Sequence, residues 1–284
     1  MTIDLAAYLR GERLPDSYLG LVDTVLRPIA ERVVSIDRRG APLVVGVTGP
    51  QGSGKSAAAG ALALLLQERG LRTAVLSIDD LYLTKAERQR LAADVHPLFL
   101  TRGVPGTHDV ALGRAVIESL GRPGETAVPR FDKATDDRRA DWDIVEGPVD
   151  VILFEGWCVG AWPQPLVALV EPINALERER DPAGVWRAYV NDALAGPYQA
   201  LFAPIGFQIL LRPPGFEVVL GWRLQQEHEL RARGGGGQSD AEIATFIQYY
   251  ERLSRHIDAE MPARADMVIQ LDAERRVVEA SGVN

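Results

Sequence analysis

The residues from Gly49 to Ser56, GPQGSGKS, have the types and spacing of a loop that binds phosphate. They meet the pattern G-x-x-x-x-G-K-[ST], in which backbone N–H groups surround phosphate oxygens at the start of a helix. In such loops the lysine reaches the β- and γ-phosphates and the serine hydroxyl ligates Mg²⁺. The sequence therefore predicts a nucleoside triphosphate site with Mg²⁺. The expected nucleotide contacts are Gly49, Pro50, Gln51, Gly52, Ser53, Gly54, Lys55, Ser56 and Ala57.

Three acidic residues follow two apolar segments that predict buried strands. Asp79 and Asp80 come after residues 72–78, and Glu155 comes after residues 149–154. Ligands of open α/β sheets bind beyond the carboxyl ends of the strands, so these acids should face the phosphate loop. We expect Asp79 to be the base that takes the proton of an acceptor hydroxyl and to lie near the metal, and Glu155 to hold Mg²⁺ together with Ser56. Asp80 is either metal-linked or structural, and a helix cap is the alternative for the acidic pair.

Two long irregular segments carry further polar side chains that could hold an acceptor. Residues 96–109, HPLFLTRGVPGTHD, and residues 129–143, PRFDKATDDRRADWD, contain prolines, glycines or dense mixed charge. A helix N-cap is the alternative for the acid that ends the first segment, and a solvated surface is the alternative for the second. The expected acceptor contacts are Asp80, Tyr82, Arg102, His108, Asp109, Lys133, Arg138 and Arg139.

Lysine is scarce in this chain. Among 31 basic residues only Lys55, Lys85 and Lys133 are lysines. Because lysine is a compact and mobile point charge whereas arginine is a planar fork, a site that needs the former would keep it. The scarcity adds weight to Lys133 as a functional residue.

The elements that must position these residues alternate between strands and helices. The sequence predicts strands at residues 43–47, 72–78, 149–154, 206–211 and 267–271, the last of which closes the sheet. It predicts helices at residues 16–39, bent or divided at Pro28, and at 55–69, 85–93, 110–120, 216–233 and 240–260, with a helical insertion at 163–203 broken by prolines. This order predicts a three-layer α/β P-loop NTPase fold with a mostly parallel central sheet. Residues 1–40 would form a helical extension and residues 41–284 the kinase domain.

The helix predicted at residues 216–233 has the features of a lid. It carries Arg223, Arg231 and Arg233 and is followed by four glycines, residues 234–237, which predict a flexible tether. Lids of this kind close over the nucleotide and bring positive charge to the transferring phosphoryl group. We therefore expect a lid at about residues 216–240, with Arg223 and Arg231 as nucleotide contacts.

Composition narrows the class of protein. The 284 residues carry a formal net charge of −8, with a pI near 5.2, which argues against nucleic acid or an anionic membrane as the main partner. Cys158 is the single cysteine, so no intramolecular disulfide is expected, and the four histidines lack the spacing of a zinc site. The first residues lack the uninterrupted apolar run of a signal peptide. We expect a cytoplasmic protein, a monomer or weak homo-oligomer.

Several motifs together resemble the D-glycerate 3-kinases, which are related to uridine kinase, phosphoribulokinase and bacterial pantothenate kinase. The motifs are GPQGSGKS, SIDDLYLT, RGVPGTHD, PRFDK and ILFEGWCVG. The resemblance implies transfer of the γ-phosphate of ATP, with Mg²⁺, to a hydroxyl of D-glycerate to give 3-phosphoglycerate. It also implies that Lys55 and Ser56 serve ATP and Mg²⁺, Asp79 is the base and Glu155 is the acid beside the metal. Arg223 and Arg231 would belong to the lid.

The sequence leaves other acceptors and one other function class open. After PRFDK the chain reads ATDDRRAD, where these relatives usually carry glycines in a pattern such as GRGDR. A nucleoside, a pantothenate-like compound or another hydroxy acid is therefore the alternative acceptor. An ATP-dependent regulatory switch is a further alternative, whereas a GTPase would need an N-K-x-D motif that the chain lacks.

Overall fold

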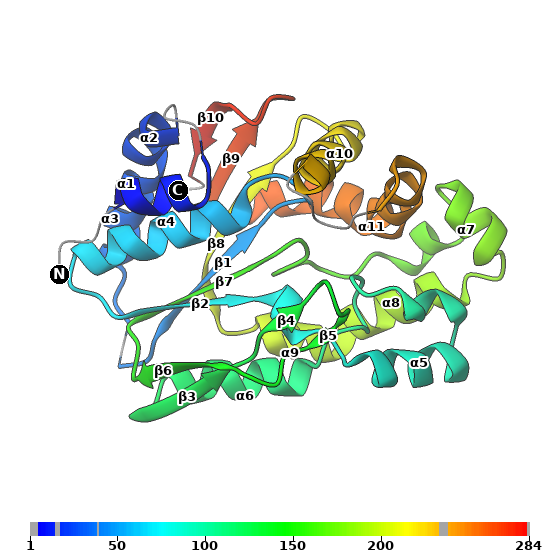
Figure 1. Cartoon of the computed structure of the whole chain (residues 1–284), viewed down its shortest axis with the longest axis horizontal. Helices are drawn as coiled ribbons and strands as arrows, with labels where there is room; N and C mark the ends of the chain where they lie inside the picture. Colours follow the sequence, from blue (N-terminus) through cyan, green and yellow to red (C-terminus); the bar gives the residue numbers. More distant parts are fainter. Residues whose placement is uncertain (1–4, 15–17, 39, 233–237, 283–284) are drawn as a thin grey trace.

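The core of the molecule is a six-stranded sheet that brings the ends of its central strands to one edge (Figure 1). The computed structural model describes residues 5–14, 18–38, 40–232 and 238–282. The strand order is β10-β9-β8-β1-β7-β2, and every neighbouring pair is parallel except β9 and β10. The predicted three-layer α/β arrangement with a mostly parallel sheet is confirmed. The strands are β1 Leu43–Thr48, β2 Thr73–Ser77, β7 Val151–Gly156, β8 Ile205–Arg212, β9 Met267–Leu271 and β10 Val277–Ser281.

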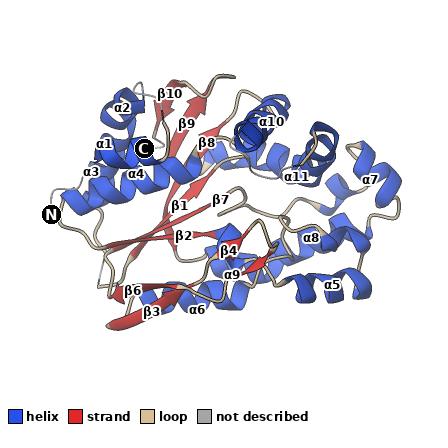
Figure 2. Cartoon of the chain, in the orientation of Figure 1, coloured by secondary structure: helices blue, strands red, loops and turns tan. Residues whose placement is uncertain are grey.

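Alternate residues of the central strands bury their side chains on opposite faces of the sheet. Val44, Ile152 and Phe154 belong to one apolar cluster, and Val45 and Leu153 belong to the other. This alternation follows from the two-residue period of a strand, and both faces are apolar because helices cover both (Figure 2). One face is covered by α1 Leu5–Gly11, α3 Arg27–Ser35 and α4 Lys55–Glu68. The other is covered by α6 Val110–Leu120, α8 Val185–Ala193, α9 Gln199–Phe202 and α11 Asp240–Glu260.

The first helical region packs on α4, the helix that follows the phosphate loop. It consists of α2 Tyr18–Leu21, a π-helical segment Val22–Leu26 and α3. The predicted bend at Pro28 takes the form of this π segment, because the proline lacks the N–H that an α-helical bond would need. The Tyr8 hydroxyl of α1 donates a hydrogen bond to the Ala57 carbonyl of α4 (3.2 Å), which attaches α1 close to the loop.

Two sequence predictions about the rest of the chain are wrong. The strand at residues 267–271 does not close the sheet, because β10 pairs with it antiparallel and forms a further edge. The β10 strand is mostly exposed, so it lacks the apolar run on which the prediction of buried strands relied. The insertion is not helical at its start either. Residues 163–174 contain only the 3-10 turn Leu166–Leu169 before α7 Ala175–Arg180, because three prolines interrupt this stretch.

Two small antiparallel strand pairs lie beside the main sheet. The strands β3 Gly124–Val128 and β6 Asp143–Gly147 pair with each other, and β4 Phe131–Asp132 pairs with β5 Asp137–Arg138 near the end of β2. The segment predicted as irregular, residues 129–143, is therefore partly a hairpin. It lies next to the 3-10 turn Ile78–Leu81 and to α5 Lys85–Asp94.

The predicted lid, at about residues 216–240, contains α10 Glu217–Ala232. The predicted glycine tether at residues 234–237 lies outside the described residues, and α11 begins at Asp240. None of the described helices is long and apolar enough to cross a membrane.

Candidate active site

The phosphate loop connects β1 to α4 through two residues that need glycine. Gly54 precedes the first residue of α4 and has a φ of +86°, and Gly52 has a φ of +79°. Both values lie in the left-handed region, which costs other residues free energy. A Cβ atom on Gly52 would also lie 2.7 Å from Cβ of Trp222 in α10. The loop therefore takes its shape from glycines and has α10 packed directly against it.

The side chains of Ser56 and Glu155 lie together and offer oxygen ligands suited to Mg²⁺. The Ser56 hydroxyl donates a hydrogen bond to Oε1 of Glu155 (3.1 Å), across the gap between α4 and β7. The other oxygen, Oε2, is buried and lacks a hydrogen-bond partner among the described residues. Hydroxyl and carboxylate oxygens are the ligand type that Mg²⁺ prefers, and a buried carboxylate oxygen needs a partner. These two residues fit a bound Mg²⁺, with the remaining ligands supplied by phosphate and water.

Asp79, the predicted base, lies in the 3-10 turn Ile78–Leu81 after β2 and has two side-chain partners. The Tyr82 hydroxyl donates to Oδ1 (2.8 Å), and Nζ of Lys133 lies 2.7 Å from Oδ2. Burial opposes ionisation of Asp79, but the charges of Lys133 and Lys55 and the two hydrogen bonds outweigh it and hold the pKa of the carboxyl well below its usual range. Asp79 is therefore ionised, as a group that accepts a proton must be.

Asp80, the neighbouring acid, is occupied by the hairpin of β4 and β5. Its Oδ2 receives a hydrogen bond from Nη1 of Arg130 (2.8 Å), and its Oδ1 receives one from the backbone N–H of Phe131 (3.0 Å). Burial raises the pKa of this carboxyl despite both partners. These contacts give Asp80 a structural role in holding the hairpin, one of the two roles that the sequence left open.

His108 lies behind the base and is buried among aromatic rings. Its ring stacks on Tyr82 with centroids 4.6 Å apart, and its Nδ1 lies 2.6 Å from the Tyr198 hydroxyl. The side chain is 5% exposed, and burial lowers its pKa to about 4, so the ring is neutral at pH 7. The structure thus places a neutral histidine next to the Tyr82 side chain that contacts Asp79.

Asp109 and Arg138 join the two irregular segments. Oδ1 of Asp109 accepts the Leu112 N–H (2.9 Å), so this residue is the N-cap of α6, as the alternative held. Its Oδ2 lies 3.4 Å from Nη2 of Arg138, which also donates to the Tyr82 carbonyl (3.0 Å). Nε of Arg138 is buried without a partner among the described residues. One capping carboxylate therefore also orients a cation of the hairpin.

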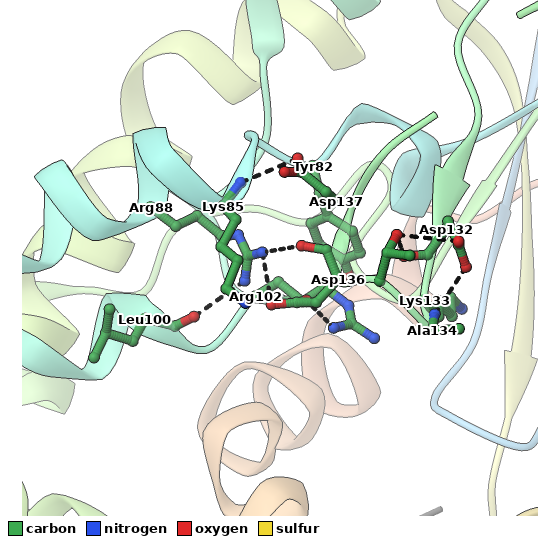
Figure 3. A network of polar contacts seen from close by, with 12 residues as sticks. Tyr82, Lys85, Arg88, Leu100, Arg102, Asp132, Lys133, Ala134, Asp136 and Asp137 are labelled. Carbon is green, nitrogen blue, oxygen red and sulfur yellow. Dashed lines mark hydrogen bonds and ion pairs between the residues drawn. The ribbon is translucent and has the colours of Figure 1, made fainter. Parts of the chain in front are cut away.

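A buried arginine on α5 fixes the hairpin that carries Lys133 (Figure 3). The Arg88 side chain is 1% exposed, and its guanidinium donates to the carbonyls of Leu83, Leu100 and Asp136 and to the Asp136 carboxylate. Arg102 makes a second ion pair with the same carboxylate. Sequence patterns did not predict a role for Arg88, Asp136 or Tyr198. The only sequence signal for Arg88 is a charge on the buried face of a polar helix.

Three arginines that were predicted to contact the acceptor or the nucleotide form ion pairs with nearby carboxylates and do not lie beside Asp79. Arg139 is exposed and pairs with Asp141, two residues away. On α10, in the predicted lid, Arg223 pairs with Glu227 (2.6 Å), and Arg231 pairs with Asp240 (2.6 Å) at the start of α11. The structure therefore brings together Asp79, Tyr82 and Lys133, but it does not bring Arg139 or Arg231 to them.

A cavity of 160 Å³ lies between the phosphate loop and α11. Gly49 and Pro50 of the loop, Trp157 after β7 and Phe216 before α10 line it, with residues of α11 on the far side. The aromatic side chains make this wall mainly apolar. The cavity thus extends from the start of the phosphate loop to the residues that precede α10.

Known proteins resemble the chain both in sequence and in structure. The model of the methylmalonyl Co-A mutase-associated GTPase MeaB matches residues 26–82, the part with the phosphate loop. The uncharacterized kinase mug58 of Schizosaccharomyces pombe is 35% identical over 74% of this chain and 79% of its own length. The chloroplastic D-glycerate 3-kinase of Arabidopsis thaliana is 32% identical over 84% of this chain, which spans 55% of that enzyme's length.

A solved structure extends the likeness to nearly the whole chain. The D-glycerate 3-kinase from Cryptococcus neoformans var. grubii is 28% identical and superposes with a TM-score of 0.74, covering 92% of this chain and 99% of its own. The chain therefore belongs to the D-glycerate 3-kinase family of P-loop kinases.

Proposed function

We propose that this protein transfers the γ-phosphate of ATP to a hydroxyl of D-glycerate and produces 3-phosphoglycerate and ADP. The observation that carries the proposal is the contact of Lys133 with Asp79 (2.7 Å), within the electrostatic reach of Lys55. It places an ionised carboxylate that can take a hydroxyl proton beside an ammonium that can bind an acceptor carboxylate. A small hydroxy acid carries both of these groups.

Phosphate binding, metal binding and proton transfer fall to different residues of the chain. Lys55 and the loop N–H groups bind the phosphates, and Ser56 and Glu155 would hold Mg²⁺, which neutralises phosphate charge when bound. Asp79 orients the acceptor hydroxyl and takes its proton. The acceptor oxygen forms a bond to the γ-phosphorus while the bond from that phosphorus to the ADP oxygen breaks. The proton thus moves to Asp79 and the phosphoryl group moves from ATP to the acceptor.

We also propose that residues 216–240, which include α10, form a lid. Trp222 of α10 already packs on Gly52, and the Arg275 side chain donates to the Gly52 carbonyl (2.6 Å). Arg223 lies one residue beyond Trp222, so it could approach the phosphates by leaving Glu227. Positive charge at that position would stabilise the transferring phosphoryl group.

The test is acceptor-dependent ADP release. The purified protein is supplied with ATP and Mg²⁺ and, in separate reactions, with D-glycerate, uridine, pantothenate or ribulose 5-phosphate. We expect D-glycerate to give the highest kcat/KM. A higher value with another acceptor would replace the substrate, and ATP binding without turnover on any acceptor would contradict the kinase assignment.

A further inference from the structure

The two oxygens of the Asp79 carboxylate have partners that differ in exposure. Oδ1 is held by the hydroxyl of Tyr82, a residue that is 3% exposed. Oδ2 contacts the ammonium of Lys133, whose side chain is 64% exposed, and the Asp79 side chain itself is 31% exposed. An acceptor hydroxyl that gives its proton to Asp79 must come within hydrogen-bond distance, about 2.6–3.2 Å. Oδ2 is therefore the oxygen on the more exposed side, and the Lys133 ammonium occupies one of its acceptor positions.

The backbone that carries Lys133 is held from both ends, so the side chain is the part that can move. Asp132 accepts the Ala134 N–H (2.8 Å) and the Thr135 hydroxyl (3.0 Å), which fixes the turn around Lys133. The buried guanidinium of Arg88 holds Asp136 further along (2.8 Å). A lysine has a flexible four-carbon stem, so its ammonium can change partner while this turn stays in place.

The residue type suits an exchange of partners. An arginine could hold the Asp79 carboxylate with two parallel hydrogen bonds, which would make release difficult. A lysine offers a single point charge that another carboxylate can attract. In a chain with 28 arginines, this position is one of three that carry lysine. Position 133 therefore carries the type of cation that another carboxylate can more easily attract away from Asp79.

We propose that Lys133 gates the base, so that the carboxylate of the acceptor draws its ammonium away from Asp79 and opens Asp79 to the acceptor hydroxyl. The proposal rests on the proposed function, because it requires an acceptor that carries both a carboxylate and a hydroxyl. Binding of the acceptor and release of Asp79 from Lys133 then occur in the same step. Water or a neutral alcohol, which lacks a carboxylate, would leave the ammonium of Lys133 on Asp79.

The experiment compares four proteins with three phosphoryl acceptors. The proteins are the wild type, Lys133→Met, Lys133→Gln and, as the matched control, Lys85→Met, which replaces an exposed residue at the start of α5. The acceptors are D-glycerate, glycerol, which has the hydroxyls without the carboxylate, and water alone. Lys133→Gln serves as a second variant, and a melting curve with ATP titration verifies that each protein is folded.

The gate predicts opposite effects on the different acceptors. In Lys133→Met we expect KM for D-glycerate to rise about 100-fold, as for the loss of a charge-assisted contact. In the same variant ATP hydrolysis without acceptor, and kcat with glycerol, should rise about 5- to 10-fold above wild type, since Asp79 is uncovered. Lys85→Met should match the wild type in all three assays.

Three outcomes would overturn the gate. Acceptor-free hydrolysis and glycerol turnover that stay at wild-type level in Lys133→Met would show that Lys133 only binds the acceptor. An equal loss of turnover with D-glycerate and glycerol would show a structural role. A rise in KM for ATP with an unchanged preference for glycerate over glycerol would show that the ammonium serves the nucleotide. Failure of the wild type to use D-glycerate contradicts the proposed function instead, so the two failures are distinguishable.

Discussion

The Tyr198 hydroxyl lies 2.6 Å from Nδ1 of His108 and joins two positions that are 90 residues apart in the chain. The Tyr198 oxygen also accepts a hydrogen bond from the backbone N–H of Gly106 (3.0 Å), which belongs to the same irregular segment as His108. The other ring nitrogen of His108, Nε2, is buried and lacks a hydrogen-bond partner among the described residues. The ring is thus enclosed in a site that favours its neutral form.

Protonation of His108 should weaken the fold at mildly acidic pH. Burial holds its pKa to about 4, whereas the unfolded chain has the usual value of about 6.5. Between these values the unfolded chain binds the extra proton, so the stabilising contribution of the neutral ring is complete above pH 6.5 and is lost as the pH falls toward 4. We expect the free energy of unfolding to decrease by about 2–3 kcal/mol more in the wild type than in His108→Asn between pH 7 and 4.5.

Urea denaturation at the two pH values measures this difference. Asparagine keeps an oxygen close to the position of Nδ1, so Tyr198 retains an acceptor while the titrating group is removed. His228→Asn is the control, because His228 is exposed on α10. Equal losses of stability in the wild type and His108→Asn would contradict the assignment of the neutral ring.

The residues of the phosphate loop and the strand ends were predictable from sequence because their signal is local. The GPQGSGKS pattern predicts the loop because its own glycines allow the backbone conformation that the loop requires. Apolar runs predict which strands are buried. The acids at the ends of β2 and β7 then follow from the rule that parallel strands point their carboxyl ends to one edge. The α6 and α11 bounds, residues 110–120 and 240–260, were predicted exactly for the same reason.

The acceptor side was less predictable because its contacts join segments far apart in the chain. Lys133 meets Asp79 across 54 residues, and Tyr198 meets His108 across 90. The density of charged residues indicated that the hairpin could bind a substrate. It did not indicate that Lys133 contacts Asp79 whereas Arg139 pairs with a neighbouring residue of its own segment. Such choices depend on tertiary packing, which short-range periodicity does not encode.

Asp79→Asn should abolish most turnover without weakening ATP binding. An asparagine keeps the shape of the side chain but cannot take a proton, so we expect kcat to fall about 10²- to 10⁴-fold. Steady-state kinetics with D-glycerate and a separate ATP titration measure the two effects. Asp80→Asn is the comparison, and its main effect should be a lower melting temperature, since Asp80 binds Arg130 and the Phe131 N–H. Normal turnover in Asp79→Asn together with loss in Asp80→Asn would make the base assignment wrong.

Glu155→Gln should raise the Mg²⁺ concentration needed for activity. The substitution removes the charge beside Ser56 and replaces a carboxylate oxygen with an amide, so the site attracts the cation less. We expect the half-saturating Mg²⁺ concentration to rise about 10-fold or more, a change typical of altered metal surroundings. Glu146→Gln, on the exposed part of β6, is the matched control. An unchanged Mg²⁺ requirement would show that the carboxylate of Glu155 does not serve the metal.

Arg88→Met tests whether the buried guanidinium positions the hairpin for catalysis as well as for folding. The variant would leave the carbonyls of Leu83 and Leu100 without their donor and release Asp136, so we expect the free energy of unfolding to fall by about 2–4 kcal/mol. Because Asp136 anchors the turn that carries Lys133, KM for D-glycerate should rise about 10-fold while the affinity for ATP stays unchanged.

Arg90→Met is the matched control for Arg88→Met, since Arg90 lies exposed on the same helix, α5. Urea denaturation measures stability, and initial rates at saturating ATP give KM for D-glycerate. A loss of stability with an unchanged KM would mean that Arg88 supports α5 and its neighbours alone. A rise in KM at a temperature well below the melting point would instead show that the ammonium of Lys133 reaches Asp79 only while the guanidinium of Arg88 holds Asp136 in place.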